Sequence, residues 1–173
     1  MTPTIETARL ALVPFGERHL TQRYVGWLND RVTVRFSELR HATHTLRSCA
    51  DYAAGMAKSG HLFWAIERQP DGTHIGNLTA YLDRANGLAD LAILIGEPDA
   101  RGAGFGREAW KAACDWLAGQ SWVRKICAGT LAANRPMLRA MEAAGMAVEA
   151  VRKDHHFVEG HAMDVVYAAR FIR

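Results

Sequence analysis

Residues 93–109 have the sequence Ile93-Leu94-Ile95-Gly96-Glu97-Pro98-Asp99-Ala100-Arg101-Gly102-Ala103-Gly104-Phe105-Gly106-Arg107-Glu108-Ala109. The apolar run at 93–95 predicts a buried strand, and Pro98 ends it because proline cannot donate to a sheet ladder. Three alternating glycines follow, and glycine lets the backbone approach a bulky anion closely. The start of a helix adds unpaired N–H groups and a partial positive charge. The stretch therefore predicts a phosphate-binding loop, flanked by Arg101 and Arg107.

The spacing of the glycines excludes two common classes of phosphate-binding motif. A dinucleotide fingerprint, G-x-G-x-x-G, would need its third glycine at Arg107, and a Walker loop would need Gly-Lys followed by Ser or Thr. The chain instead has Arg-Gly-x-Gly-x-Gly after a strand and before a helix. This pattern resembles the acyl-CoA diphosphate loop of the GNAT superfamily of N-acyltransferases. A glycine-rich turn without a ligand is the alternative.

The composition is that of an ordinary globular domain. The chain has 173 residues, 49% of them hydrophobic and 23% charged, so we expect one domain over residues 1–173. A net charge of +3 suits an anionic cofactor but does not indicate nucleic acid. Cys49, Cys114 and Cys127 have no metal-binding spacing and are interpreted as reduced thiols. With no signal sequence or membrane-spanning run recognised, we expect a cytoplasmic protein.

The pattern along the chain predicts a βαα-βββ-α-β-α-ββ order. Expected helices cover residues 17–28, 45–58, 105–119 and 133–144, and Cys114 should lie on a buried helix face. Expected strands cover residues 8–13, 62–66, 74–82, 88–95, 124–130, 146–152 and 163–170. The strand after the crossover helix should run parallel to the strand at 88–95. This order resembles the GNAT topology throughout: an α/β (α+β) fold whose mixed, mostly antiparallel sheet has a central splayed parallel pair, flanked by about four helices.

The resemblance implies that acetyl-CoA is the cofactor, with its pantetheine arm between the splayed strands. Asn134 stands at the start of a helix that ends at Gly145. It would bind the cofactor, cap the helix, or do both. Arg139 would approach the ribose phosphate, or lie on a solvated helix face. The tyrosine that serves as general acid in this family is replaced by Met141. The expected cofactor contacts are Ile93, Leu94, Ile95, Arg101, Gly102, Ala103, Gly104, Phe105, Gly106, Arg107, Asn134 and Arg139.

The reaction requires that a proton be removed from the attacking amine. An alkyl amine is mostly an ammonium ion at pH 7 and must lose a proton before it attacks a thioester. Asp90 occupies the place where many GNAT enzymes carry a catalytic glutamate, although it could equally be an acid at an exposed strand start. Glu97, which could instead cap the loop, and Tyr81 are the other catalytic candidates. Backbone N–H groups of residues 93–95 would face the thioester.

The acceptor side should combine the first helices with the last hairpin. The expected acceptor-binding residues are Trp27, Asn29, Arg35, Phe36, His155 and His156. The run Trp-Leu-Asn-Asp, followed by Arg-Phe, resembles the GNAT branch that contains ribosomal-protein alanine and nucleotide-amino-sugar N-acetyltransferases. Arg31, Arg35 and Arg40 would suit a phosphate-bearing acceptor, or would form a solvated basic face. Trp27 could stack on the acceptor or belong to the core.

These observations predict an N-acetyltransferase that moves an acetyl group from acetyl-CoA to a primary amine of a small molecule or amino sugar, by direct attack in a ternary complex. The alternatives are an N-terminal protein acetyltransferase of the ribosomal type and a non-catalytic acyl-CoA-binding protein. His41 and His44 lack a third ligand, so no metal is expected. We expect no nucleic-acid or membrane partner. The last strand, at 164–170, could pair across a homodimer.

Overall fold

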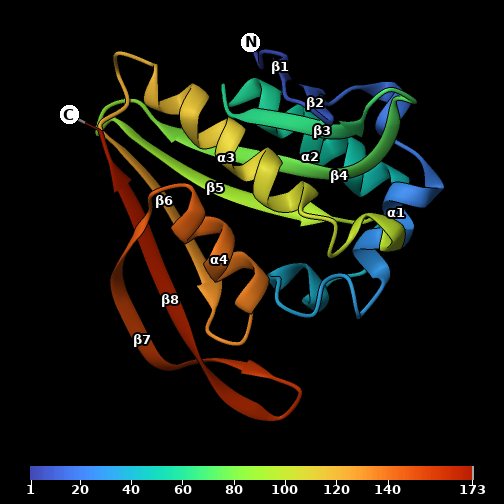
Figure 1. Cartoon of the computed structure of the whole chain (residues 1–173). Coiled ribbons are helices and arrows are strands. Elements are labelled where there is room, and N and C mark those ends of the chain that lie inside the picture. The colour runs from blue at the N-terminus through green and yellow to red at the C-terminus, as the bar shows by residue number, and fades with distance from the viewer. Residues whose placement is uncertain (173) are drawn as a thin grey trace.

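The computed structural model describes residues 1–172, and within them eight strands form one sheet in the order β1-β2-β3-β4-β5-β6-β8-β7 (Figure 1). The strands are β1 (Ile5–Glu6), β2 (Leu10–Pro14), β3 (Leu62–Arg68), β4 (Thr73–Asp83), β5 (Leu88–Ile95), β6 (Lys125–Leu131), β7 (Ala147–Val158) and β8 (His161–Phe171). The helices are α1 (Gln22–Asn29), α2 (Leu46–Lys58), α3 (Phe105–Ala118) and α4 (Arg135–Ala143). Short 3₁₀ turns are η1 (Glu17–His19), η2 (Glu38–His41) and η3 (Pro98–Ala100). The expected fold class is confirmed, and the expected element order is found with one additional short strand, β1, at the start.

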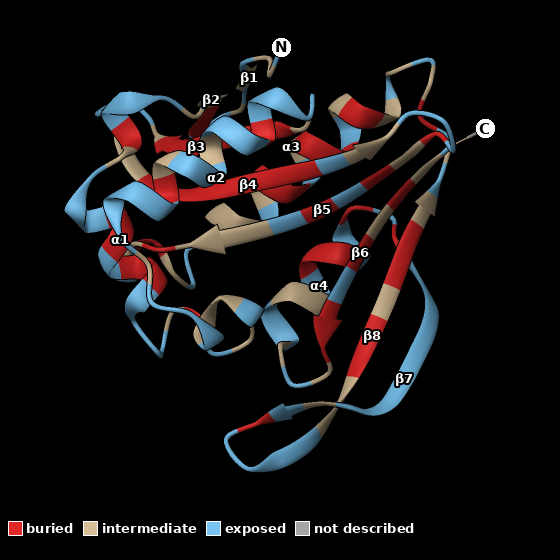
Figure 2. Cartoon of the chain, turned by 180° about the vertical axis from the view of Figure 1, so that it is seen from behind, coloured by how far each residue is buried: buried red, intermediate tan, exposed pale blue. Residues whose placement is uncertain are grey.

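The boundaries differ from expectation at both ends of the chain. The helix expected over residues 17–28 is divided into η1 and α1, because the Thr21 hydroxyl caps α1 by accepting a hydrogen bond from the Tyr24 N–H. The final hairpin is longer than expected and turns at Glu159 and Gly160. The expectation that the last strand is free to pair across a homodimer is wrong, because β8 already lies between β6 and β7. The outer edge is β7, which is exposed along most of its length (Figure 2).

The parallel pair at the centre of the sheet is short, as its splayed form predicted. β5 and β6 are in register only at Leu88↔Lys125, Ala89↔Ile126 and Asp90↔Cys127. Beyond these pairs the two strands diverge, as Figure 1 shows. The backbone groups of β5 that face β6 after Asp90 therefore have no ladder partner, so they are available to a ligand placed between the strands.

Helices cover the two faces of the sheet unequally. α3 and α4 lie on one face over the main core, which includes Trp64, Trp110 and Cys114. On the other face α1 and α2 pack against the half formed by β3 and β4 and against Leu94 at the end of β5, leaving β6, β8 and the rest of β5 without a covering helix (Figure 2). The splayed strands are therefore open on the face that α1 and α2 leave free, while α3 and α4 lie over the other face. No helix within residues 1–172 combines the length and apolar character that crossing a bilayer requires.

Candidate active site

The glycine loop presents a row of unused backbone donors. Gly102 and Gly104 have φ angles of 78° and 84°, which side chains other than glycine rarely adopt, and Gly104 is the N-cap of α3. Within the described chain, no backbone N–H from residue 102 to residue 107 has a hydrogen-bond acceptor. Residues 102, 103 and 107 are exposed to water, but Gly104, Phe105 and Gly106 are half-buried, and unpartnered N–H groups there are costly unless a ligand or water satisfies them. The loop is therefore built to hold an anion at the start of α3.

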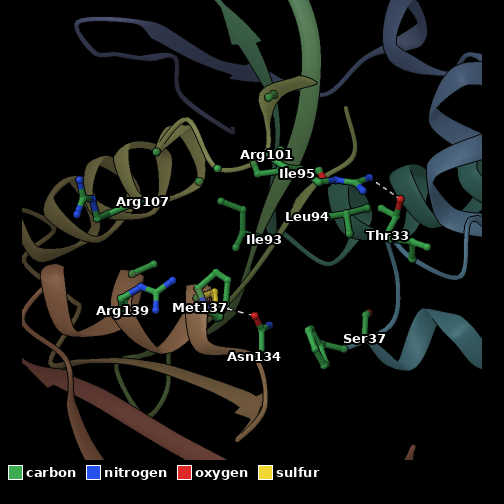
Figure 3. Close-up of a pocket in the computed structure, with 18 residues that line it drawn as sticks. Thr33, Ser37, Ile93, Leu94, Ile95, Arg101, Arg107, Asn134, Met137 and Arg139 are labelled. Atoms are coloured by element: carbon green, nitrogen blue, oxygen red, sulfur yellow. Dashed lines mark hydrogen bonds between the residues drawn. The ribbon is translucent and has the colours of Figure 1, made fainter. Parts of the chain in front are cut away.

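The arginines around this loop have different roles. Arg101 donates to the Gly96 carbonyl oxygen at 2.7 Å and to the Thr33 hydroxyl at 2.6 Å, so its guanidinium anchors the loop to the end of β5. Arg107 on α3 and Arg139 on α4 form no ion pair with any described residue. Figure 3 shows both at the end of the pocket opposite Thr33. Among the described arginines that line this pocket, these are the ones whose guanidinium groups have no hydrogen-bond or ion-pair partner.

A pocket of about 590 Å³ joins the loop to the splayed strands. It lies between the C-terminal half of β5, the start of α3 and the start of α4 (Figure 3). Among the residues expected to contact the cofactor, the pocket is lined by Ile93, Leu94, Ile95, Arg101, Gly102, Gly104, Gly106, Arg107, Asn134 and Arg139. Ala103 and Phe105 do not line it. The Phe105 ring instead lies 4.5 Å from the Arg9 guanidinium.

Asn134 occupies the junction of the site but its side chain is already engaged. Its Oδ1 caps α4 by accepting from the Met137 N–H at 3.4 Å, and its Nδ2 donates to the Thr130 hydroxyl at 3.1 Å. The helix-cap alternative is therefore realised, although Asn134 also lines the pocket. Met141, which replaces the usual tyrosine, is 2% exposed and belongs to the core. It cannot supply a proton to the site.

A second pocket, of about 410 Å³, opens from the same splay on the other side. It shares a boundary with the first pocket, formed by Phe36, Ser37, Ile93, Asn134 and Met137. Its acidic groups are Asp90 and Glu38, its basic group is His156, and no lysine or arginine of residues 1–172 lines it. Because the two pockets adjoin, groups bound in each would meet beside β5.

Asp90 is the carboxylate best placed to act on a bound group. It lies on β5 at the last register pair before the splay and lines the second pocket. No described lysine, arginine or histidine forms an ion pair with it. The surrounding protein desolvates the carboxylate and raises the pKa of Asp90 above its ordinary value. A raised pKa makes a carboxylate a stronger base.

The other two catalytic candidates have contrasting surroundings. Tyr81 lines the second pocket and shares a 2.6 Å hydrogen bond with the hydroxyl of Tyr52 on α2. Burial, followed by that hydrogen bond, raises the pKa of Tyr52 far above its ordinary value, so Tyr52 stays protonated. Glu97 lines neither pocket, and its carboxylate accepts from Arg23 Nε at 2.6 Å. The structure thus brings Tyr81 and Asp90 together but leaves Glu97 outside.

Of the residues expected to bind the acceptor, some line the pockets and others do not. Trp27 is 6% exposed and packs in the second core cluster, so it does not line either pocket. Asn29 uses its side chain to hold the His44 backbone, donating at 2.8 Å and accepting at 2.8 Å. Phe36 lines both pockets. Arg35 lines neither and pairs with Glu159 of the last hairpin at 2.9 Å.

The last hairpin reaches the second pocket through one histidine. His156 lines this pocket and its Nδ1 lies 3.1 Å from Glu38 of η2, whereas His155 stacks on His156 outside it. Sequence reasoning missed Glu38 and Tyr167, which also line this pocket. Tyr167 lies opposite Gly129, where an added Cβ would come within 3.0 Å of its ring, and only the fold shows this pairing. Among residues 1–172 no cluster of side chains could hold a metal ion, and His41 pairs with Glu38.

Comparisons with known proteins agree with this geometry. Residues 9–147 match the family model of the acetyltransferase (GNAT) domain, while no curated protein matches the chain significantly. A similar solved structure is RimL, a ribosomal L7/L12 α-N-protein acetyltransferase in complex with coenzyme A, with a TM-score of 0.85 and 16% identity over 98% of both chains. Another is spermidine N-acetyltransferase from Vibrio cholerae with CoA and spermine, with a TM-score of 0.84 and 17% identity over 96% of this chain and 97% of that one. Mycobacterium smegmatis RimJ in complex with CoA-disulfide has a TM-score of 0.83 and 18% identity, over 98% of this chain and 87% of that one.

Proposed function

Because this chain belongs to the GNAT acetyltransferase family and is an acyltransferase that uses acetyl-CoA, we propose that it acetylates a primary amine of a small cationic molecule, amino sugars included. The single observation that carries the choice of acceptor is the second pocket, whose unpaired carboxylate, Asp90, faces a space that no arginine or lysine of residues 1–172 lines. An ammonium ion is the acceptor form that such a pocket attracts.

The first pocket supports a binding mode for the acyl donor. The unpartnered N–H groups of residues 102–107 would hold the diphosphate, and Arg107 and Arg139 would add charge beside it. The thioester arm would then lie between β5 and β6, where ladder bonds are absent. When bound, the donor supplies a thioester carbonyl. The chain supplies position, and orientation alone can contribute several kcal/mol, with roughly 7–11 as a ceiling.

Proton removal is the chemical task of the second pocket. Asp90, directly or through a water molecule, would accept the first proton from the ammonium. The amine nitrogen then bonds to the acetyl carbon as the carbon–sulfur bond breaks. The second proton leaves the nitrogen and ends on the sulfur, so that the products are an amide, a free thiol and one released proton. Because position 141 is a buried methionine, no tyrosine there donates the proton to sulfur.

The basic residues near the second pocket do not support a phosphate-bearing acceptor. Arg40 is held by Glu38 at 2.8 Å and by the Ser37 carbonyl oxygen at 2.7 Å. Arg35 is paired with Glu159. An acceptor phosphate would have to displace these partners. The acidic lining favours an unphosphorylated amine, which narrows the amino-sugar alternative to sugars without a phosphate near the amine.

A protein N-terminus is the second candidate acceptor. It is favoured by the likeness to RimL and RimJ, which are structurally as similar to this chain as the spermidine enzyme is. An α-amine is also cationic near neutral pH. A peptide would have to pass beside η2 and the tip of the last hairpin, which are joined by the Arg35–Glu159 and His156–Glu38 contacts. Because these contacts tie the last hairpin to the segment around η2 beside the second pocket, they favour a small acceptor.

The proposal is tested by measuring thiol release from acetyl-CoA with a panel of acceptors. The panel contains alkyl monoamines, diamines, amino sugars with and without phosphate, and peptides with free N-termini. We expect turnover with unphosphorylated small amines at a higher kcat/KM than with peptides. Turnover with peptides alone would contradict the small-amine acceptor and support a protein N-terminus as the acceptor. Binding of CoA without turnover of any amine would contradict both.

A further inference from the structure

Arg9 contacts the glycine loop from outside it. It lies just before β2, about ninety residues from the loop in sequence, and its Nη1 donates to the Ala103 carbonyl oxygen at 3.0 Å. Its Nε and Nη2 donate to Glu108 Oε2 at 2.7 and 2.6 Å, and its backbone N–H donates to Glu108 Oε1 at 3.0 Å. Its guanidinium also covers the Phe105 ring. One side chain therefore fixes the loop and the first turn of α3 together.

The contact with Ala103 determines where a backbone donor points. The peptide unit between Ala103 and Gly104 is planar and trans, so its C=O and N–H point in opposite directions. Because Arg9 holds the C=O on its own side, the Gly104 N–H is directed away from Arg9. Gly104 lines the first pocket and Arg9 does not. The unpartnered Gly104 N–H is thus aimed into the pocket.

The contact with Glu108 removes an unfavourable charge. Glu108 is in the first turn of α3, next to the proposed diphosphate position, where an unpaired carboxylate would repel an anion. Hydrogen bonds from Thr7 and Arg9 outweigh the effect of burial and lower the pKa of Glu108, so it remains ionised. Arg9 balances this charge within 2.6 Å.

We propose that Arg9 is a positioning residue for the acyl donor: by holding Ala103 and Glu108 it orients the Gly104 N–H and neutralises the start of α3. This rests on the proposed binding of the donor diphosphate by residues 102–107. Arg9 does not touch the donor in this assignment. It acts through the loop, so its loss should weaken donor binding without changing the chemical step.

The test measures the affinity of coenzyme A by titration calorimetry for the wild type, Arg9→Met and Arg9→Lys. Arg9→Met should weaken binding roughly tenfold or more, because a charge-assisted hydrogen bond and the charge balance are lost together. Arg9→Lys keeps the positive charge near Glu108 but cannot bond Glu108 and Ala103 at once, so a partial loss is expected. With acetyl-CoA, KM should rise in parallel while kcat at saturation stays within about twofold of the wild type.

Arg47→Met is the matched control, since Arg47 forms an exposed pair with Asp51 on α2. Its affinity should equal that of the wild type. Wild-type affinity in Arg9→Met would overturn the proposal, and so would wild-type affinity in Arg9→Lys if Arg9→Met does not fold. A fall in kcat without a change in affinity would also overturn it. Failure of the wild type itself to bind coenzyme A would contradict the donor site, which is a different outcome.

Discussion

Asp90 on β5 lies directly opposite Tyr81 on β4, at the last register position before β5 and β6 separate. Side chains opposite one another on antiparallel strands point to the same face, so the carboxylate and the phenol share the second pocket. Tyr81 is in turn fixed by Tyr52 of α2. The splay, an unpaired carboxylate and a tethered phenol therefore coincide at one level of the sheet, which is where an amine would meet the thioester.

Asp90→Asn should reduce kcat roughly 100- to 10,000-fold, because asparagine keeps the shape of the side chain but cannot accept a proton. The affinity for coenzyme A should be unchanged, since Asp90 does not line the first pocket. Steady-state kinetics and calorimetry on the same preparation separate the two effects. Asp51→Asn on the exposed face of α2 is the control. Unchanged turnover in Asp90→Asn would exclude Asp90 as the base.

The raised pKa of Asp90 predicts the acid limb of the pH profile. Asp90 is active only when ionised, so kcat/KM should fall as the pH drops through its raised pKa, above the ordinary value of 3.8. Fluorescence-monitored unfolding at each pH distinguishes this loss from acid denaturation. In Asp90→Asn the residual rate should lack this limb. A limb that persists in the variant would belong to another group.

Local patterns were enough to predict the elements around the site. β5 was expected at residues 88–95 and is observed there, because an Asn-Gly turn and Pro98 mark its ends. The start of α1 at Gln22 differs from the predicted start at residue 17, although Thr21 is a good N-cap residue. What local patterns lack is the partner of each side chain. Arg101 is a flanking positive charge in the sequence, and only the fold shows its guanidinium donating to Thr33, 68 positions away.

The lack of information on distant partners also explains why some of the predicted site residues lie outside the two pockets. Trp27 lies in a polar and aromatic segment, so its sequence context fits either a binding surface or the core. In the structure Gly96 lacks a side chain where the Trp27 ring packs. Glu97 and Arg23 are 74 positions apart, and nothing in either segment indicates that they pair. Charge and residue type predict chemistry, but contacts between distant segments decide which groups remain free.

Gly104→Val should abolish measurable binding of coenzyme A. Gly104 has a φ of 84°, which a branched side chain rarely adopts, and an added Cβ would lie 3.5 Å from Arg9. Gly72→Val is a matched control, since Gly72 has a φ of 68° in a turn with open space around it. Both variants should lose stability, but only Gly104→Val should lose the ligand. Retained binding would show that the loop holds something else.

Gly96→Ala should destabilise the fold by roughly 1–3 kcal/mol or more, because a Cβ at this position would lie 2.0 Å from the Trp27 ring. The ring is buried and cannot move without disturbing α1. Denaturant unfolding measures the change. Gly26→Ala on α1 has open space and should instead be neutral or stabilising. Equal stability of Gly96→Ala and the wild type would contradict the packing of Trp27 against this turn.

His74 should make the fold less stable in acid. Burial among the rings of Phe15, His19 and Trp27 lowers the pKa of His74 to about 4, from 6.5 in an unfolded chain. Between these values the unfolded state binds the proton and the folded state does not. Its contribution is therefore constant above pH 6.5 and is lost as the pH falls towards 4, by about 3 kcal/mol at most.

Urea unfolding of the wild type and His74→Gln between pH 4 and pH 7 tests this expectation. Glutamine cannot titrate, so the free energy of unfolding of His74→Gln should fall less steeply below pH 6.5 than that of the wild type. His161→Gln, at an exposed position on β8, should keep the wild-type slope. Parallel curves for His74→Gln and the wild type would mean that His74 takes up its proton equally in both states, and would contradict this expectation.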